Sequence, residues 1–361
     1  MMTPQRSTRV ACSRHPASRA GFGAMERLPK PILCIPLVIQ WLWLGFRYRS
    51  QTLPSVVNPA IETGGLAGES KYACLARIGP DHAPWVARTA FIPAANRHAT
   101  SAAVATLGFP LIAKPDIGWC GHGVRRINDA DELKDYIAIF PPHAAFLLQE
   151  LIPGPYEAGL FYMRGPTEAH GRIIGLAVRH PPQIVGDGMR AIGMLMAADP
   201  RLAPMIRHYR AALPSGRLHD IPAAGERVIL GTVASLRVGG RYENAMRLNT
   251  PSLEARVDAI ARSMNGFHFG RLDVRFGSED ALCRGDFQII EVNGAGSEAI
   301  EFWDPTLSLT SAYRGVFAKQ KTLFALAAEM RAAGCVPIGT PALFRAWRRQ
   351  LRLMRHYPPS N

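Results

Sequence analysis

Residues 270–276 place charged side chains at alternate positions of a short apolar run. Arg271, Asp273 and Arg275 alternate with apolar residues, and successive side chains of a strand point to opposite faces. The pattern therefore predicts a strand with these three side chains on one face. Taken alone, it also fits a structural ion pair between the carboxylate and a neighbouring arginine.

Residues 287–296 contain a second strand pattern, with Glu291 and Asn293 on one face. If this stretch pairs with the strand before it, Asp273, Glu291 and Asn293 converge. Two carboxylates and an amide are hard oxygen ligands, which Mg²⁺ prefers where it also holds nucleotide phosphates. The sequence therefore predicts a metal site on these two strands.

Residues 109–124 combine a lysine with a glycine-rich loop. A short apolar run ends at Lys114, and the loop then leads into a second short run over residues 124–127. Glycines let the backbone turn and point N–H groups at a phosphate, while a lysine supplies positive charge. The loop is not a Walker A motif, and an ordinary hairpin turn is the alternative interpretation. The loop glycines are Gly118, Gly121 and Gly123.

Residues 146–157 form an apolar strand that runs into Gln149 and Glu150, followed by a Pro-Gly turn and Glu157. A linker of this kind can offer backbone groups to an adenine edge and a carboxylate to ribose hydroxyls. The alternative is a plain strand followed by a turn.

Residues 179–190 carry two arginines around a Gly-Asp-Gly turn. The turn suits the start of a helix, with Asp187 as its N-terminal cap. Arg179 and Arg190 are candidate contacts for a phosphate or a substrate carboxylate.

The order of these segments, preceded by Lys71 in a Gly-Glu-Ser-Lys context, resembles the ATP-grasp superfamily. The resemblance covers roughly residues 65–305. It is greatest for the branch that contains D-alanine–D-alanine ligase and the ATP-grasp part of cyanophycin synthetase, and the Val-Gly-Asp-Gly turn at residues 185–188 resembles the latter.

The resemblance implies binding of ATP and Mg²⁺, with Mn²⁺ as an alternative metal. Arg271 would be the catalytic residue that stabilises the transferring charge, and the metal ligands would be Asp273, Glu291 and Asn293. The implied nucleotide contacts are Lys71 and Lys114 at the phosphates, Gln149, Glu150, Leu151 and Ile152 at the adenine, and Glu157 at the ribose. The patterns described above add Gly118, Gly121, Gly123 and Arg179 to the candidate nucleotide-binding residues.

The implied reaction is ATP-dependent ligation in two steps. A substrate carboxylate attacks the γ-phosphorus of ATP to give an acyl phosphate and ADP, and an amine, less often a thiol or hydroxyl, then displaces phosphate. Such phosphoryl transfer depends on positioning and on neutralising oxygen charge. The alternative function is a catalytically silent ATP-binding scaffold or a membrane-associated sensor with the same fold.

The expected fold is α+β, with two mixed α/β subdomains gripping ATP. The expected parts are a disordered basic tail (1–30), an apolar helix with a reduced N-terminal region (31–108), a small subdomain (109–155), a larger subdomain with the metal site (156–320) and a basic amphipathic helix (321–361).

The formal net charge of +14 over 361 residues belongs to the two ends of the chain. Residues 1–50 carry +7 and residues 341–361 carry +5, which leaves +2 for the whole middle. A nucleic-acid-binding groove would need the excess on the folded core, so this class of function is disfavoured. The 48% hydrophobic content excludes a chain that is mainly disordered.

The two ends carry apolar helices next to basic residues. Residues 32–46 are too short an apolar run for the roughly 20 residues of a membrane span, so a buried or interfacial helix is expected. Trp41, Trp43 and the following arginines keep contact with a membrane surface as an alternative. The basic C-terminal helix is expected to cap the body, or else to meet anionic lipid or an acidic partner.

The six cysteines are irregularly spaced and form no C-x-x-C pair, which disfavours a disulfide scaffold and a zinc site. A cytoplasmic protein is expected, with peripheral contact at the inner face of the membrane as an open alternative. Met1 and Met25 are both candidate start residues.

Overall fold

The computed structural model describes residues 21–361, and the fold is α+β, as predicted. The expected tail falls largely on residues 1–20, which lie outside the described residues, as does Met1. Residues 21–30 differ from the disordered tail expected to extend to residue 30: they form turns that lead into the first helix, and Met25 is buried against Leu33 and Ala312.

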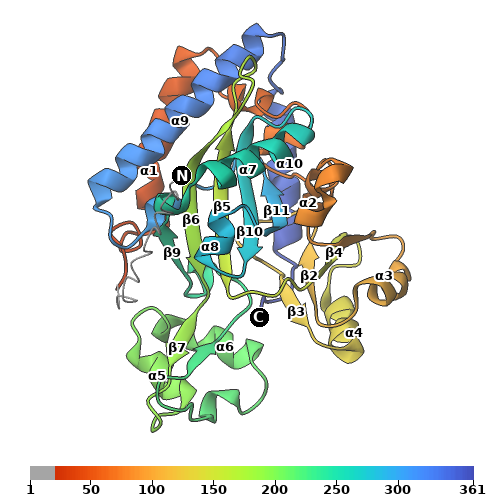
Figure 1. Cartoon of the computed structure of the whole chain (residues 1–361), viewed down its shortest axis with the longest axis vertical. Coiled ribbons are helices and arrows are strands. Elements are labelled where there is room, and N and C mark those ends of the chain that lie inside the picture. The colour runs from red at the N-terminus through yellow and green to blue at the C-terminus, as the bar shows by residue number, and fades with distance from the viewer. Residues whose placement is uncertain (1–20) are drawn as a thin grey trace, which may run out of the picture.

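A five-stranded antiparallel sheet forms the centre of the molecule (Figure 1). Its strands, in spatial order, are β11 (Gln288–Asn293), β10 (Phe269–Phe276), β5 (Tyr156–Met163), β6 (Arg172–His180) and β9 (Arg241–Asn244). The strands predicted from the alternation around Asp273 and Glu291 are thus β10 and β11, and they are neighbours.

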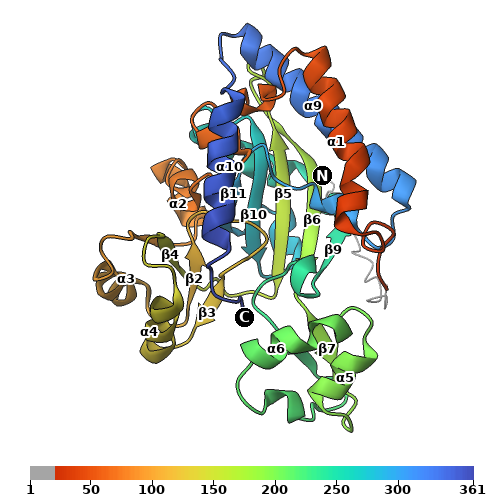
Figure 2. The same ribbon diagram turned by 180° about the vertical axis from the view of Figure 1, so that it is seen from behind.

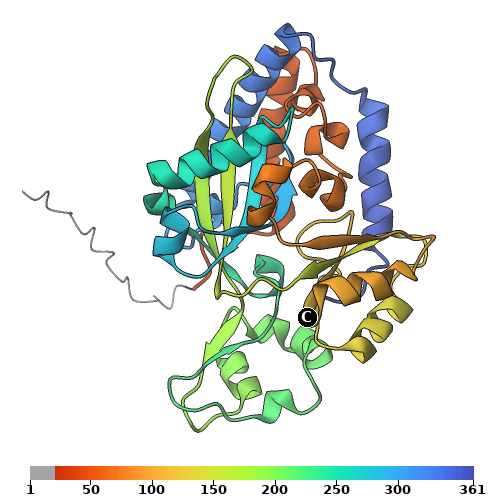
Figure 3. The same cartoon turned by 45° about the vertical axis from the view of Figure 1, so that its right-hand side comes forward.

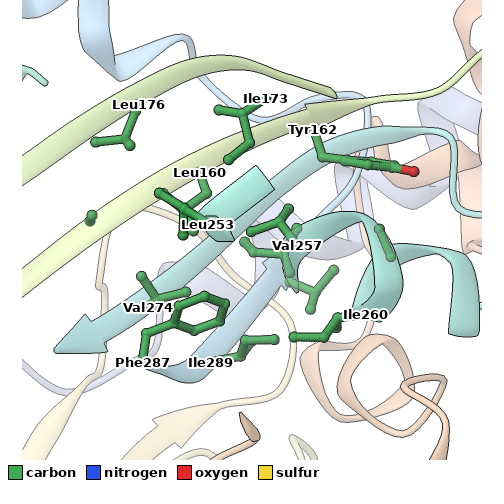
Figure 4. Packing of buried hydrophobic residues seen from close by; sticks show 14 of the residues in the cluster. Leu160, Tyr162, Ile173, Leu176, Leu253, Val257, Ile260, Val274, Phe287 and Ile289 are labelled. Atoms are coloured by element: carbon green, nitrogen blue, oxygen red, sulfur yellow. The ribbon is translucent and has the colours of Figure 1, made fainter. Parts of the chain in front are cut away.

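One face of this sheet is apolar and packs on helices α7 (Pro251–Ser263) and α8 (Glu279–Cys283). Leu160, Leu176 and Val274 point to this face and meet Leu253 and Val257 of α7 (Figure 4). Full burial of such a side chain contributes about 1.5–3 kcal/mol. The alternation of strand side chains therefore sends the charged residues of the same strands to the opposite face.

A four-stranded antiparallel sheet lies beside the first, with helices α3 (Ala99–Leu107) and α4 (Ala130–Ile139) packed on it. Its strands, in spatial order, are β1 (Thr89–Ile92), β4 (Phe146–Glu150), β2 (Leu111–Pro115) and β3 (Arg125–Ile127). The boundary expected at residue 109 falls inside this unit, because β1 pairs with β4 in the register Thr89↔Gln149.

A third, small unit lies beyond the ends of β6 and β9 (Figure 1). It consists of strands β7 (Gln183–Val185) and β8 (Arg227–Ile229) with helices α5 (Ile192–Ala198) and α6 (Ile206–Ala212) around its own core. Asp187 accepts hydrogen bonds from the backbone of Met189 and Arg190, so it closes a turn ahead of α5 rather than capping that helix. Arg190 forms an ion pair with Asp187 in this turn.

Helices α1 (Lys30–Arg47) and α9 (Leu309–Ala332) lie side by side over the second face of the large sheet (Figure 2). The edge of the Trp41 ring packs on Phe324 with 5.0 Å between ring centroids. The apolar run thus forms the expected helix, half of it packed on the body. None of the helices in residues 21–361 has the length and apolar character that crossing a membrane requires.

Helix α10 (Thr340–Met354) packs on the body of the molecule (Figure 3). This agrees with the interpretation of the basic C-terminal segment as a capping helix. Gln350 is buried, and its Oε1 accepts a hydrogen bond from the backbone N of Gly68 at 2.7 Å. Arg349 pairs with Glu62. Helix α2 (Lys71–Leu75) is capped at its N-terminus by Ser70, whose Oγ accepts from the backbone N of Ala73.

Asn58 is fully buried and joins the segment before α2 to the start of β10. Its Nδ2 donates to the carbonyl oxygens of Gly64 and Phe269, and its Oδ1 accepts from the backbone N of His268 and Phe269.

We expect Asn58→Ala to lower the free energy of unfolding by about 3 kcal/mol, because buried backbone groups lose their partners. Urea denaturation followed by circular dichroism measures the change. The control is Asn96→Ala at an exposed position, expected within about 0.5 kcal/mol of the parent. Equal urea midpoints for the two variants would contradict this role for Asn58.

Candidate functional site

Strands β10 and β11 bring the predicted metal ligands and the predicted catalytic arginine to one place. Arg271 lies opposite Asn293, and Asp273 lies opposite Glu291, in the antiparallel register of the two strands. All four side chains line one cavity of about 670 Å³ on the charged face of the large sheet.

Asp273 is the centre of this group and is almost completely buried. Arg271 Nε donates to Asp273 Oδ1 at 2.6 Å, and Arg179 Nη1 and Asn293 Nδ2 donate to Asp273 Oδ2 at 3.1 and 3.2 Å. Arg179 Nη1 also lies 2.6 Å from Glu157 Oε1. Burial raises the pKa of Glu157, although the nearby arginine opposes the shift.

Lys71, the first residue of α2, connects the glycine loop to β11. Its Nζ donates to the carbonyl oxygen of Gly118 at 2.5 Å and lies 3.2 Å from Glu291 Oε1. Burial alone would raise the pKa of Glu291, but Lys71 and Lys114 lower it to about 2. Glu291 is therefore a carboxylate throughout the physiological pH range.

Lys114 lies between the two sheets at the end of β2. Its Nζ donates to Gln149 Oε1 at 3.0 Å and to the backbone oxygen of Ile290 in β11 at 2.7 Å. Gln149 Nε2 also donates to the Ile290 oxygen, at 3.1 Å. Burial lowers the pKa of Lys114 to about 8, with Glu291 pulling in the opposite direction.

The glycine loop joins β2 to β3 and forms one wall of the cavity. Gly121 and Gly123 adopt φ values of 69° and 73°, which a residue with a side chain rarely adopts. A Cβ atom at Gly121 would lie 2.4 Å from Val233 Cγ1, so this position also lacks room for a side chain. Gly118 is held by Lys71.

The expected adenine contacts lie apart from the charged cavity. Glu150 pairs with Arg88, and Glu150 and Ile152 line a second, open groove of about 580 Å³. Leu151 stands between them in the linker to β5. Lys114 and Gln149 separate this groove from the cavity, because both donate to the same backbone oxygen of β11.

Sequence reasoning missed two groups that support the site. Asp116 Oδ1 accepts from Ser70 Oγ and from the backbone N of Tyr72, which fixes the start of α2 and hence Lys71. Its position two residues after Lys114 was the available signal. The buried Lys319–Glu301 pair, at 2.5 Å, joins α9 to the segment after β11, and Lys319 faces the cavity. No local pattern marks this pair.

The donor set of the predicted metal site is two carboxylates and an amide. Within the part of the chain that the structure describes, no three or more His, Cys, Asp or Glu side chains gather as a metal site. A metal at this place would therefore depend on Asp273 and Glu291, with Asn293 as the third ligand.

No family model and no curated protein sequence matches the chain. Solved structures that resemble it include D-alanine–D-alanine ligase from Bacillus anthracis (15% identity, TM-score 0.43, covering 76% of this chain and 71% of that one). VanG D-Ala:D-Ser ligase from Enterococcus faecalis (14%, 0.40, 73% and 63%) and a bifunctional glutathione synthetase from Pasteurella multocida (13%, 0.33, 64% and 34%) also match.

These similarities lie at 13–15% identity and TM-scores of 0.33–0.43, so the resemblance to ATP-grasp ligases stays a prediction. The chain spans about a third of the length of the glutathione synthetase and 63% of the VanG ligase. With identities and TM-scores this low, any role for a side chain has to be argued from its own contacts.

The low pKa of Lys114 predicts that its ammonium group loses its proton as the pH rises through about 8. Glu291→Gln removes a neighbouring negative charge that favours the protonated form, so the pKa of Lys114 falls further in that variant. NMR titration of ¹³C-labelled lysine side chains measures both values, with Lys114→Met assigning the signal. An unchanged midpoint in Glu291→Gln would contradict the proximity of the two groups.

Proposed function

We propose that this protein is an ATP-dependent ligase that joins a carboxylate to an amine through an acyl phosphate. The observation that carries the proposal is the cross-strand group of Arg271, Asp273, Glu291 and Asn293 in one cavity with Lys71 and the glycine loop. Cations, carboxylates and a backbone loop in one cavity are the parts that phosphoryl transfer requires.

The nucleotide would lie along the boundary between the two sheets. Lys71, Lys114 and the backbone N–H groups of the glycine loop would hold the phosphates, and residues 149–152 with Glu157 would hold the nucleoside. Lys114 and Gln149 now bond to the Ile290 oxygen between the groove and the cavity. Binding of ATP across this boundary therefore requires Lys114 to exchange the Ile290 oxygen for a phosphate.

Mg²⁺ fits the donor set, and Mn²⁺ would fit it as well. Asn293 donates its amide N–H to Asp273, which leaves its carbonyl oxygen for a metal beside the carboxylates of Asp273 and Glu291. A bound divalent cation would supply neutralising charge to the phosphate oxygens. The low pKa of Glu291 keeps that ligand ionised for this task.

Arg271 would bind the transferring phosphoryl group or the substrate carboxylate, held in place by Asp273 and by the Glu298 carbonyl oxygen. An oxygen of the carboxylate attacks the γ-phosphorus, the bond to ADP breaks, and an acyl phosphate forms. The amine nitrogen then attacks the acyl carbon, and phosphate leaves. The cations lower the cost of the negative charge that builds up on the oxygens in the first step.

The competing function, a silent ATP-binding scaffold, would need the same cleft without turnover. The two arginines on Asp273 are compatible with it, since they neutralise that carboxylate without a metal. Phosphate release from ATP with a panel of carboxylates and amines separates the two functions.

We also propose that the outer face of α1 contacts an anionic membrane surface on the cytoplasmic side. Seven large apolar side chains of this helix are more than half exposed: Ile32, Ile35, Val38, Ile39, Leu42, Trp43 and Phe46. Residues 27–61 contain four basic residues and no acidic one, which complements the negative charge of an anionic lipid surface.

We expect Arg271→Ala and Asp273→Asn each to lower the turnover of ATP by about two to four orders of magnitude, because transition-state charge loses its support. Phosphate release measures turnover, and thermal unfolding checks that the variants fold. Arg262→Ala, at a half-exposed position of α7, serves as the control with unchanged turnover. Ligation retained in both site variants would defeat the assignment.

We expect the protein to sediment with vesicles that contain phosphatidylglycerol and less with pure phosphatidylcholine vesicles. Ile39→Glu should weaken binding about tenfold or more, since a charged side chain replaces an apolar one that would enter the lipid surface. Ile229→Glu on β8, where the side chain is also more than half exposed, is the matched control. Dimer formation without vesicle binding would instead give this face to a second copy of the chain.

A further inference from the structure

The cavity beside Arg271 extends well beyond the charged group. One end is lined by Lys71, Asp273 and Glu291, and the other end reaches between α1 and α9. We call the second end the apolar arm. It is lined mainly by Leu33, Leu37 and Trp41 of α1, Val316 and Leu323 of α9, and Phe269 of β10. Figure 2 shows the two helices that form its walls.

The apolar arm is built by side chains that the helix periodicity brings to one side of α1. Leu33, Leu37 and Trp41 recur every four residues and therefore lie on one face of the helix. Lys319, the charged residue that α9 presents to the cavity, is neutralised by its pair with Glu301. The arm thus offers aliphatic and aromatic surface to whatever extends from the charged end.

The junction between the two ends is where a reacting carboxylate would lie. Arg271 Nη1 donates to the carbonyl oxygen of Glu298 at 2.8 Å, and Phe161 packs under the guanidinium. Glu298 also faces Lys30 at the start of α1. Apart from the Lys319–Glu301 pair, the lining beyond this junction is mainly apolar, and a molecule with its carboxylate on Arg271 would extend its remaining atoms into the arm.

We infer that the carboxylate substrate is an acid with an apolar hydrocarbon chain, and that the chain occupies the apolar arm. The inference rests on the proposed ligase function and adds the class of its substrate. A short polar acid or a zwitterionic amino acid would leave this surface without contacts, whereas each methylene group buried there favours binding about fourfold.

Helix α1 gives a second reason to favour a hydrocarbon chain. It separates the arm from the exposed apolar face described above, so the helix is apolar on both sides. An acid dissolved in a lipid surface would meet the outer face of the same helix whose inner face lines the arm.

The test uses the full chain without vesicles, ATP, Mg²⁺ and hydroxylamine as a small amine that converts an acyl phosphate to a hydroxamate. Straight-chain acids from acetate to decanoate are the probes. We expect kcat/KM for hydroxamate formation to rise about fourfold per methylene until the arm is filled. Glutamate and alanine should react more slowly than octanoate.

Two substitutions of Leu37, a residue that lines the arm, distinguish a direct contact with the hydrocarbon chain from a general loss of folding. Leu37→Asp should flatten the dependence of kcat/KM on chain length, and Leu37→Phe should shorten the longest acid accepted. Met194→Asp, an exposed apolar position on α5, is the control with the parent profile.

Hydroxamate formation that is independent of chain length, or faster with polar acids, would overturn the substrate class and leave the ligase intact. Lack of hydroxamate and of phosphate release with every acid and amino acid would overturn the ligase, and the inference with it. Chain-length dependence retained in both Leu37 variants would place the hydrocarbon elsewhere.

Discussion

Two carboxylates directly opposite each other in adjacent strands are the constraint on which the site depends. Asp273 and Glu291 occupy paired positions of β10 and β11, and like charges in that arrangement repel. Arg271 and Arg179 neutralise the first carboxylate, and Lys71 the second. The strand pairing is therefore stable only with cations from several elements, and this requirement draws β6 and α2 to the same point.

The same requirement explains how the two sheets are joined. Lys114 comes from the small sheet and reaches the backbone of β11 in the large one, with Gln149 beside it. Burial lowers the pKa of Lys114 to about 8, so its ammonium group carries a desolvation cost at this contact. This hydrogen bond holds the two sheets together, and Lys114 could still exchange the backbone oxygen of Ile290 for an anionic oxygen.

The strands and faces of the site were predictable because alternation is a local property. Once β10 and β11 pair, the alternation in the sequence predicts that Arg271, Asp273, Glu291 and Asn293 converge on one face of the sheet. The assignment of β1 to the small sheet was not predictable, because it depends on a long-range pairing with β4. The same holds for Lys319 and for the apolar arm, which arise only when α9 packs beside α1. The prediction that Asp187 caps a helix was wrong, because the same residue types favour a helix cap and a closed turn.

Helix α1 separates an internal space from the outside with one thin layer of side chains. A molecule that shifts α1 by binding on one side of the helix changes the binding free energy of a molecule on the other side. Such coupling is reciprocal by thermodynamic necessity. A ligand in the cavity would therefore change the affinity at the outer face by the same factor by which attachment at that face changes the affinity for the ligand. Under the two proposals above, binding of the substrate in the arm and attachment of the protein at the outer face of α1 would be coupled through this one helix.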